Sequence, residues 1–249
     1  MLSPYLPRPA LAIAPQASYE LAITENPRNS GSTGSGGRRK RSLGATGKLW
    51  MPGRTLTLSF LNVKNPSLKS DYHAMARQWI ELSGANLHLE LVDDDDMQAD
   101  LRVATNPKAY YSWAACGTDA LSPEYTDRPN VSLGLTSEHK LYQFNALHEF
   151  GHVFGADHEH LHPDASIPWD EAKVISTYMA EWGTTEEDVR SNFLDKRENT
   201  GLIKTDYDIR SVMHYPVEQK FTLGDWECGI NNKLSEKDCE FMRLAYPHD

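Results

Sequence analysis

The sequence predicts a mixed α/β fold of the α+β type, in which a twisted mixed sheet with two long helices is followed by a subdomain rich in loops and helices. Two observations predict it. Segments with alternating apolar residues, as in β-strands, are found before residue 155, where helical patterns interrupt them. After residue 155 the alternation stops, and loops and helical patterns fill the rest of the chain.

Four segments of the first half are predicted to form strands. In residues 55–62, Leu56, Leu58 and Phe60 fall on one face of an extended chain. The other three predicted strands cover residues 87–91, 99–105 and 130–136. The run of aspartates at 93–96 is expected to form a solvated turn, and calcium binding there is the less favoured alternative.

The helical patterns are placed by apolar spacing and by capping residues. Ser70 is predicted to cap a helix that runs to Leu82, with its apolar residues three or four positions apart. Later helices are expected at 170–180, 185–194 and 235–246. Ser235 and Asp238 have the spacing of a capping box for the last of these.

Residues 1–46 are expected to form a disordered leader or propeptide, separate from a catalytic domain at 47–249 that divides into subdomains 47–156 and 157–249. A Gly/Ser linker at 29–37 leads into the basic run 38–41. Residues 1–49 carry a net charge of +5 and the remaining residues −15. We expect cleavage after Arg41, leaving Ser42 as the new N-terminus; a nuclear-import patch or a solvated charge run remains open.

The composition excludes some classes of function. A formal charge of −10 is unfavourable for binding nucleic-acid phosphates, so no nucleic-acid partner is expected. No apolar run approaches the roughly 18 residues that a membrane span needs. Three cysteines allow one disulfide, with Cys228 and Cys239 as the closest pair in sequence, or three free buried thiols.

The chemistry is concentrated in residues 146–160. His148 and His152 are four residues apart, so on a helix they project from one face and bind one metal, with Glu149 beside them. Gly155 is expected to end this helix in a left-handed turn that brings His158 back to the same ion. Three neutral imidazoles with an open fourth position form a catalytic zinc site, so one zinc per chain is predicted.

This pattern resembles the signature of the metzincin zinc proteases, matched by His148, Glu149, His152, Gly155 and His158. Residues 211–215 resemble the Met-turn of this family in its astacin-like form. The resemblance implies a cleft between two subdomains, with Met213 beneath the zinc and Tyr215 as a displaceable zinc ligand that stabilises the oxyanion. It also implies that Glu159 receives the amino group of the mature N-terminus.

By the same resemblance, the chain is a zinc-dependent endopeptidase that hydrolyses protein or peptide substrates through a zinc-activated water, with Glu149 as general base. The alternative is a catalytically silent zinc-binding interaction module of the same fold. We expect a secreted monomer, although the sequence has no clear signal peptide; an intracellular protein targeted through residues 38–41 is the competing hypothesis. The substrate is expected to add as a strand along residues 130–135.

Three features depart from the astacin pattern. The chain has His160-Leu161-His162 after the third histidine in place of arginines, and three cysteines cannot form the two disulfides of that family. No aspartate of the leader matches the one that blocks zinc. His160, His162 and His214 are predicted to support the site rather than bind a second ion, and Cys116 is predicted to be a buried thiol.

Overall fold

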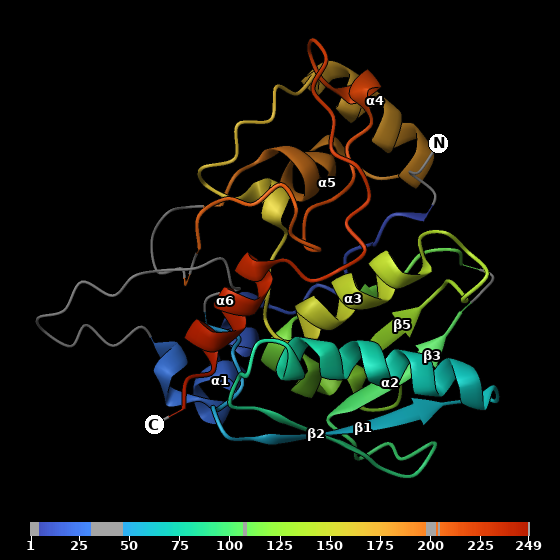
Figure 1. Ribbon diagram of the computed structural model, residues 1–249, viewed down its shortest axis with the longest axis vertical. Helices are drawn as coiled ribbons and strands as arrows, with labels where there is room; N and C mark the ends of the chain where they lie inside the picture. The colour runs from blue at the N-terminus through green and yellow to red at the C-terminus, as the bar shows by residue number, and fades with distance from the viewer. Residues whose placement is uncertain (1–4, 31–46, 107–108, 198–202, 204, 249) are drawn as a thin grey trace, which may run out of the picture.

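The computed structural model describes residues 5–30, 47–106, 109–197, 203 and 205–248. Its centre is a five-stranded sheet of order β2-β1-β3-β5-β4 (Figure 1). Strands β1 (Thr55–Leu61), β2 (His88–Leu91), β3 (Leu101–Thr105) and β5 (Val131–Leu133) run parallel, whereas β4 (Trp113–Ala114) is antiparallel to β5. The mixed sheet that the sequence predicts is confirmed.

The edge of the sheet differs from the prediction. Residues 130–135 are not an exposed edge, because β5 pairs with β3 on one side and with β4 on the other. The expectation that a substrate adds along residues 130–135 is therefore wrong, and β4 is the free edge on that side. With only two residues, β4 is too short to show an alternating pattern in the sequence.

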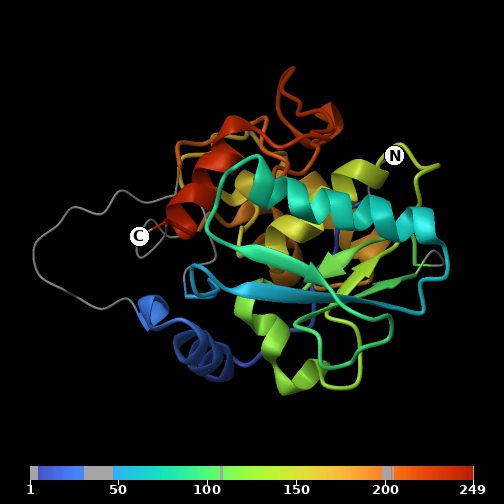
Figure 2. The ribbon, with the colours of Figure 1, turned by 60° about the horizontal axis from the view of Figure 1, so that its bottom comes forward.

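Two helices pack against each other on one face of the sheet, α2 (Pro66–Glu81) and α3 (Tyr142–Val153) (Figures 1 and 2). Helix α2 begins four residues before the predicted cap at Ser70, because Asn65 accepts hydrogen bonds from the backbone N–H groups of Ser67 and Leu68. The buried indole of Trp79 on α2 donates to the carbonyl of Leu147 on α3 at 2.9 Å. This contact fixes the height of α3 above the sheet.

The C-terminal part contains α4 (Glu171–Trp182), α5 (Glu186–Val189), the π-helical turn η6 (Arg190–Leu194) and α6 (Glu236–Ala245), with the 3-10 turns η5 (Glu159–Leu161) and η7 (Gln219–Phe221). The predicted helix at 185–194 is divided between α5 and η6. Ser235 and Asp238 form the predicted capping box of α6. In the described part of this half, strand-like pairing is limited to two isolated bridges, so the absence of alternation is confirmed.

The leader differs from the predicted disorder over residues 5–30. It contains α1 (Pro15–Glu25) and the turn η2 (Pro27–Ser30), and α1 lies with the 3-10 turns η3 (Gly117–Leu121) and η4 (Pro123–Tyr125) on the face opposite α2 (Figure 2). Only Ser18 and Ala22 of α1 are buried, so the helix has almost no apolar face for a sequence pattern to reveal.

Polar side chains attach this leader to Leu49 and Trp50, which precede β1. The amide of Asn26 donates to the Trp50 carbonyl at 2.9 Å, and the amide of Asn29 donates to the Leu49 carbonyl at 2.8 Å. Ser18 donates to Asp119 of η3. Most of the Gly/Ser linker, the basic run and Ser42 lie outside the described residues.

Two further sequence expectations concern cysteines and the membrane. Cys116, Cys228 and Cys239 are all free thiols, and burial raises the pKa of Cys116 to about 12. Among the described residues, no helix is both long and apolar enough to cross a membrane. The aspartate run forms a turn between β2 and β3, in which Lys69 pairs with Asp94 and Ser59 receives the backbone N–H of Asp96.

The C-terminal end of α3 is held by two residues that are distant from it in sequence, one before β1 and one after α6. Trp50 donates its indole N–H to the carbonyl of Val153 at 2.8 Å, and Tyr246 donates its hydroxyl to the carbonyl of Phe154 at 2.9 Å. Both side chains are fully buried. They satisfy carbonyls that the helix end leaves without an internal partner.

Replacing Tyr246 by Phe removes this donor and leaves the buried Phe154 carbonyl with one partner fewer. We expect Tyr246→Phe to lower the free energy of unfolding by about 1–3 kcal/mol, measured by denaturant titration of the full-length protein. The matched control is Tyr19→Phe, at a tyrosine that is 44% exposed, where a change within about 0.5 kcal/mol is expected. Equal effects of the two substitutions would contradict this role of Tyr246.

Candidate metal centre

Helix α3 presents two imidazoles to one point. His148 and His152 lie a turn apart on α3, and each has one ring nitrogen fixed by a backbone carbonyl. The Nδ1 of His148 donates to the carbonyl of Val212 at 3.0 Å, and the Nδ1 of His152 donates to that of Ala156 at 2.8 Å. With the proton held on Nδ1, each Nε2 lone pair is available to a metal.

The turn after α3 delivers the third histidine. Gly155 has a φ of 81°, and a Cβ added there would lie 2.7 Å from Cδ2 of Leu49. The backbone N–H of Gly155 donates to the carbonyl of His152, and that of Ala156 to the carbonyl of Gly151, which closes the helix end. The left-handed turn predicted at Gly155 is present, and the chain beyond it runs back to His158.

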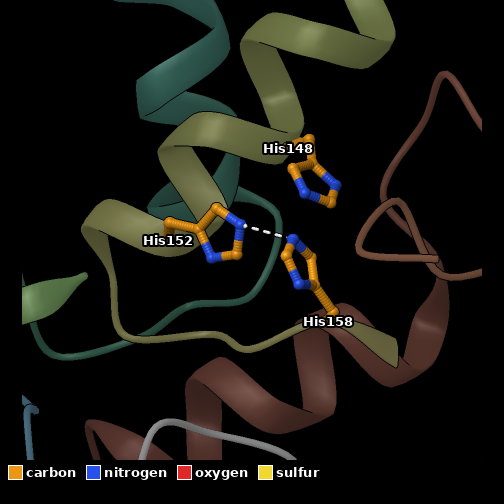
Figure 3. Close-up of side chains that lie close together, drawn as sticks. All are labelled: His148, His152 and His158. Atoms are coloured by element: carbon orange, nitrogen blue, oxygen red, sulfur yellow. Dashed lines mark hydrogen bonds between the residues drawn. The ribbon is translucent and has the colours of Figure 1, made fainter. Parts of the chain in front are cut away.

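Figure 3 shows His148 and His152 projecting from the helix toward His158, which comes from the segment that follows. The ligand atoms of the three residues all lie within 4.8 Å of one another, and the Nε2 atoms of His152 and His158 are 3.1 Å apart. Nitrogens about 2.0–2.1 Å from a tetrahedral zinc are separated by roughly 3.3 Å. In the part of the chain that the structure describes, no other group of histidine, cysteine and acidic residues has such a geometry.

The protonation of these groups also fits a metal. Burial, reinforced by the neighbouring imidazoles, lowers the pKa of His148 and His158 well below the usual value, so both rings are neutral, as a ligand must be. The Nε2 of His148 and both carboxyl oxygens of Glu149 are buried without a hydrogen-bond partner in the protein. Buried polar atoms in this number are rare unless they face a ligand or a reacting group.

Met213 packs against the helix that carries His148 and His152. A Cβ at Gly151 would lie 2.3 Å from the sulfur of Met213 and 2.7 Å from the ring of Trp79, so this part of α3 rests directly on both side chains. The carbonyl of Met213 accepts the backbone N–H of Glu159 at 3.0 Å. The turn at 211–215 is thus joined to both the helix and the segment that carries the third histidine.

No protein-family model and no curated protein matches the sequence. A solved structure of myroilysin is 28% identical and matches with a TM-score of 0.74 over 83% of this chain and 98% of that chain. A crystal structure of myroilysin is 24% identical, with a TM-score of 0.60 over 96% of this chain and 98% of that chain. High choriolytic enzyme 1, a hatching enzyme zinc-protease from Oryzias latipes (medaka fish), is 13% identical, with a TM-score of 0.52 over 82% and 92% of the two chains.

The three-histidine cluster, the sequence signature that it completes and the common fold together decide the class of protein. The chain is a zinc metallopeptidase whose fold is similar to that of myroilysin. At 24% and 13% identity, the second and third structures support the fold alone.

The structure of the metallopeptidase adds a supporting residue that the sequence analysis recognised only as a helix cap. Asp238 is buried, and its carboxylate accepts the hydroxyl of Ser211 at 2.6 Å and the backbone N–H of Val212 at 3.0 Å. The carbonyl of the same Val212 orients His148. Asp238 therefore fixes the loop that fixes the first zinc ligand.

The third ligand has a support of its own. The carboxylate of Asp157 accepts the backbone N–H of His158 at 2.7 Å and pairs with Arg197, whose Nε lies 2.7 Å from it. The charge of Arg197 and these hydrogen bonds lower the pKa of Asp157 although burial opposes the shift. No local sequence pattern indicates this pair, because its members are 40 residues apart.

Tyr215 packs against two of the three imidazoles of the cluster. Its ring is 5.3 Å from that of His148 and 4.6 Å from that of His158, and it stacks on His160 at 4.5 Å. Burial raises the pKa of its phenol well above the usual value. The hydroxyl donates at 3.0 Å to the carbonyl of Pro7, in the leader.

The three histidines near the cluster, His160, His162 and His214, form hydrogen bonds with other groups of the protein. The Nε2 of His160 and that of His162 lie 2.8 Å and 3.1 Å from the carbonyls of Asn192 and Thr205. His214 lies 2.8 Å from the hydroxyl of Tyr207 and 2.7 Å from the carbonyl of Tyr215. None of the three belongs to the metal-binding group found among the described residues, and their supporting role stays a prediction.

Glu159 is buried and accepts the backbone N–H of Asp208 at 2.7 Å. Burial raises the pKa of its carboxyl well above the usual value. Its predicted partner, the amino group of Ser42, lies outside the described residues, so this pairing stays a prediction.

Removing the carboxylate of Asp238 should loosen the loop behind His148. We expect Asp238→Ala to weaken zinc binding by about 10- to 100-fold, measured by competition with a chelator, as is typical when a residue behind a metal ligand is lost. The control is Glu236→Ala, which removes an exposed carboxylate from the same first turn of α6. Unchanged zinc affinity in Asp238→Ala would show that the loop holds His148 without it.

Proposed function

We propose that Glu149 is the general base of this zinc endopeptidase and that Tyr215 holds the carbonyl oxygen of the scissile bond. His148, His152 and His158 would hold the zinc. When bound, zinc polarises the scissile carbonyl and lowers the pKa of a coordinated water toward about 7. The single observation that carries the proposal is that the unpartnered carboxylate of Glu149 is buried beside the convergent imidazoles.

Glu149 and Tyr215 have separate roles in this proposal: Glu149 transfers the proton, and Tyr215 stabilises the charge on the carbonyl oxygen. Glu149 takes a proton from the attacking water and returns it to the leaving amine, which requires a carboxylate within reach of both. Burial removes competing water from this carboxylate. The contact of Tyr215 with the Pro7 carbonyl supports its role, since this hydroxyl already donates to the backbone oxygen of an extended segment at the metal centre.

Replacing Glu149 by Gln keeps the size of the side chain and removes the base. We expect Glu149→Gln to lower kcat/KM on a denatured protein substrate by about 10²- to 10⁴-fold while one zinc per chain is retained. Glu138→Gln, the same change at an exposed position, is the control. Undiminished hydrolysis would rule out Glu149 as base; a silent zinc-binding module would keep its function in both variants.

We also propose that the leader keeps the enzyme inactive until residues 1–41 are removed. Residues 5–14, here called the N-terminal segment, run between the sheet and the C-terminal elements (Figure 1). This segment contacts both the sheet edge at β4, where substrate would bind, and Tyr215. The backbone N–H of Arg8 donates to the carbonyl of Ser112, and the carbonyl of Pro7 accepts the hydroxyl of Tyr215. A substrate cannot use these contacts while the segment does.

Cleavage after Arg41 would leave the segment on a free fragment, and the new amino group of Ser42 would then be available to Glu159. We propose an extracellular site of action, because a leader that keeps the peptidase inactive would prevent it from cleaving proteins of the cell that makes it. The substrates are proteins or peptides, and the proposed active form is a monomer without a nucleic-acid partner.

Changing residues 38–41 to serine should leave an uncut chain of low activity, because the N-terminal segment stays attached at a high effective concentration. The natural chain, after treatment with a protease that cuts at basic pairs, should gain activity on a denatured protein substrate. The control replaces two exposed basic residues elsewhere, Arg210→Ser with Lys233→Ser. Full activity of the uncut variant, with N-terminal sequencing showing an intact leader, would disprove the block.

A further inference from the structure

The N-terminal segment places one peptide group where a substrate's would lie. The carbonyl of Pro7 accepts from Tyr215 at 3.0 Å, and the N–H of the same peptide group, that of Arg8, donates to the carbonyl of Ser112 at 2.8 Å. Ser112 directly precedes β4, the free edge of the sheet. The peptide group therefore spans the distance from the sheet edge to the tyrosine that we assign to the scissile carbonyl.

The side chain that follows this carbonyl enters an aromatic cleft. The guanidinium carbon of Arg8 lies 3.8 Å from the ring centroid of Trp182 and 5.2 Å from that of Tyr111. Its Nε is buried and has no hydrogen-bond partner among the residues that the structure describes. The ring faces hold this cation by cation–π attraction and stacking.

The chemistry of the cleft favours a planar cation. Two aromatic faces match the flat guanidinium of arginine better than the compact ammonium of lysine. Glu181 is close enough to favour the charged form of Arg8, although burial lowers the pKa of the guanidinium. A groove of about 980 Å³ continues from Arg8, with Arg128 and Asp188 as charged residues of opposite sign in its lining.

Prolines restrict the backbone on both sides of Arg8. Pro7 and Pro9 fix their own φ angles, and Pro9 disfavours the helical conformation at Arg8. Residues 7–14 form neither helix nor turn, so this stretch would lose little conformational entropy on binding in an extended form. Substrates that add to a sheet edge bind in this extended form, with specificity set by pockets for their side chains.

We propose that the cleft between Tyr111 and Trp182 is a substrate subsite for a cationic side chain, arginine above all, at the residue that follows the scissile bond. This inference rests on the proposed function, because it takes Tyr215 as the group that holds the scissile carbonyl. The leader occupies the subsite with its own arginine, and removal of the leader opens it to substrate.

The test uses the zinc-loaded enzyme after removal of the leader, with a series of fluorogenic peptides that carry Arg, Lys, Leu or Glu at one position. Fragment masses identify the bond cut. With Arg directly after that bond, we expect kcat/KM to exceed that of the Leu peptide by about 10-fold, with Lys between them and Glu lowest. Trp182→Leu should bring the Arg-to-Leu ratio close to one, whereas Trp182→Phe, which keeps a ring face, should retain part of it.

A second measurement does not depend on the fold of the Trp182 variants. A synthetic peptide of residues 5–14 should inhibit the enzyme of unaltered sequence after its leader has been removed. The Arg8→Ala version of the peptide should inhibit about 10-fold more weakly. Equal cleavage of the Arg, Leu and Glu peptides, together with equal inhibition by the two synthetic peptides, would overturn the subsite and leave the peptidase intact. If the enzyme cuts neither these peptides nor a denatured protein, the proposed function itself fails.

Discussion

At Gly155 the backbone must adopt a positive φ and pass Leu49 without room for a Cβ, and these two requirements decide whether three imidazoles can share an ion. Helix α3 alone supplies two of them. A continued helix would carry His158 away along its axis, because each residue adds about 1.5 Å. The turn instead sends the chain back beneath the helix, where the Met213 carbonyl receives the next segment at Glu159.

The ligand set is held mainly by backbone groups. The carbonyls of Val212 and Ala156 orient the imidazoles of His148 and His152. Val212 is itself held by the buried carboxylate of Asp238, which accepts the backbone N–H of Val212. Backbone groups do not change rotamer, so the Nε2 atoms of His148 and His152 are preorganised for the metal. The subdomain without strands thus supplies the rigid part of the site through one loop and one helix cap.

The sequence was sufficient for the parts of this molecule that depend on local spacing. The i, i+4 pair on α3, the glycine that ends it and the alternation of β1 are each contained within a dozen residues. The parts that were missed depend on distant partners or very short elements. β4 has two residues, and Asp238 acts on a loop 26 positions away.

The leader was missed for a different reason. Sequence patterns detect helices through an apolar face, but α1 buries little more than Ser18 and Ala22 and is attached by amide side chains and a hydroxyl. Its extended start is fixed by Pro7 and Pro9, residues that from sequence alone resemble an unstructured tail. Order imposed by docking rather than by local preference leaves no periodic signal.

Leu49 and Trp50 touch two parts of the molecule at once. Their side chains brace the turn and the last carbonyls of α3, while their own carbonyls are satisfied by amides of the leader. Under the proposed removal of residues 1–41, water would have to replace those amides directly behind the helix that carries His148 and His152. The chain with its leader would then be the more stable form, and the cleaved enzyme the more hydrated one.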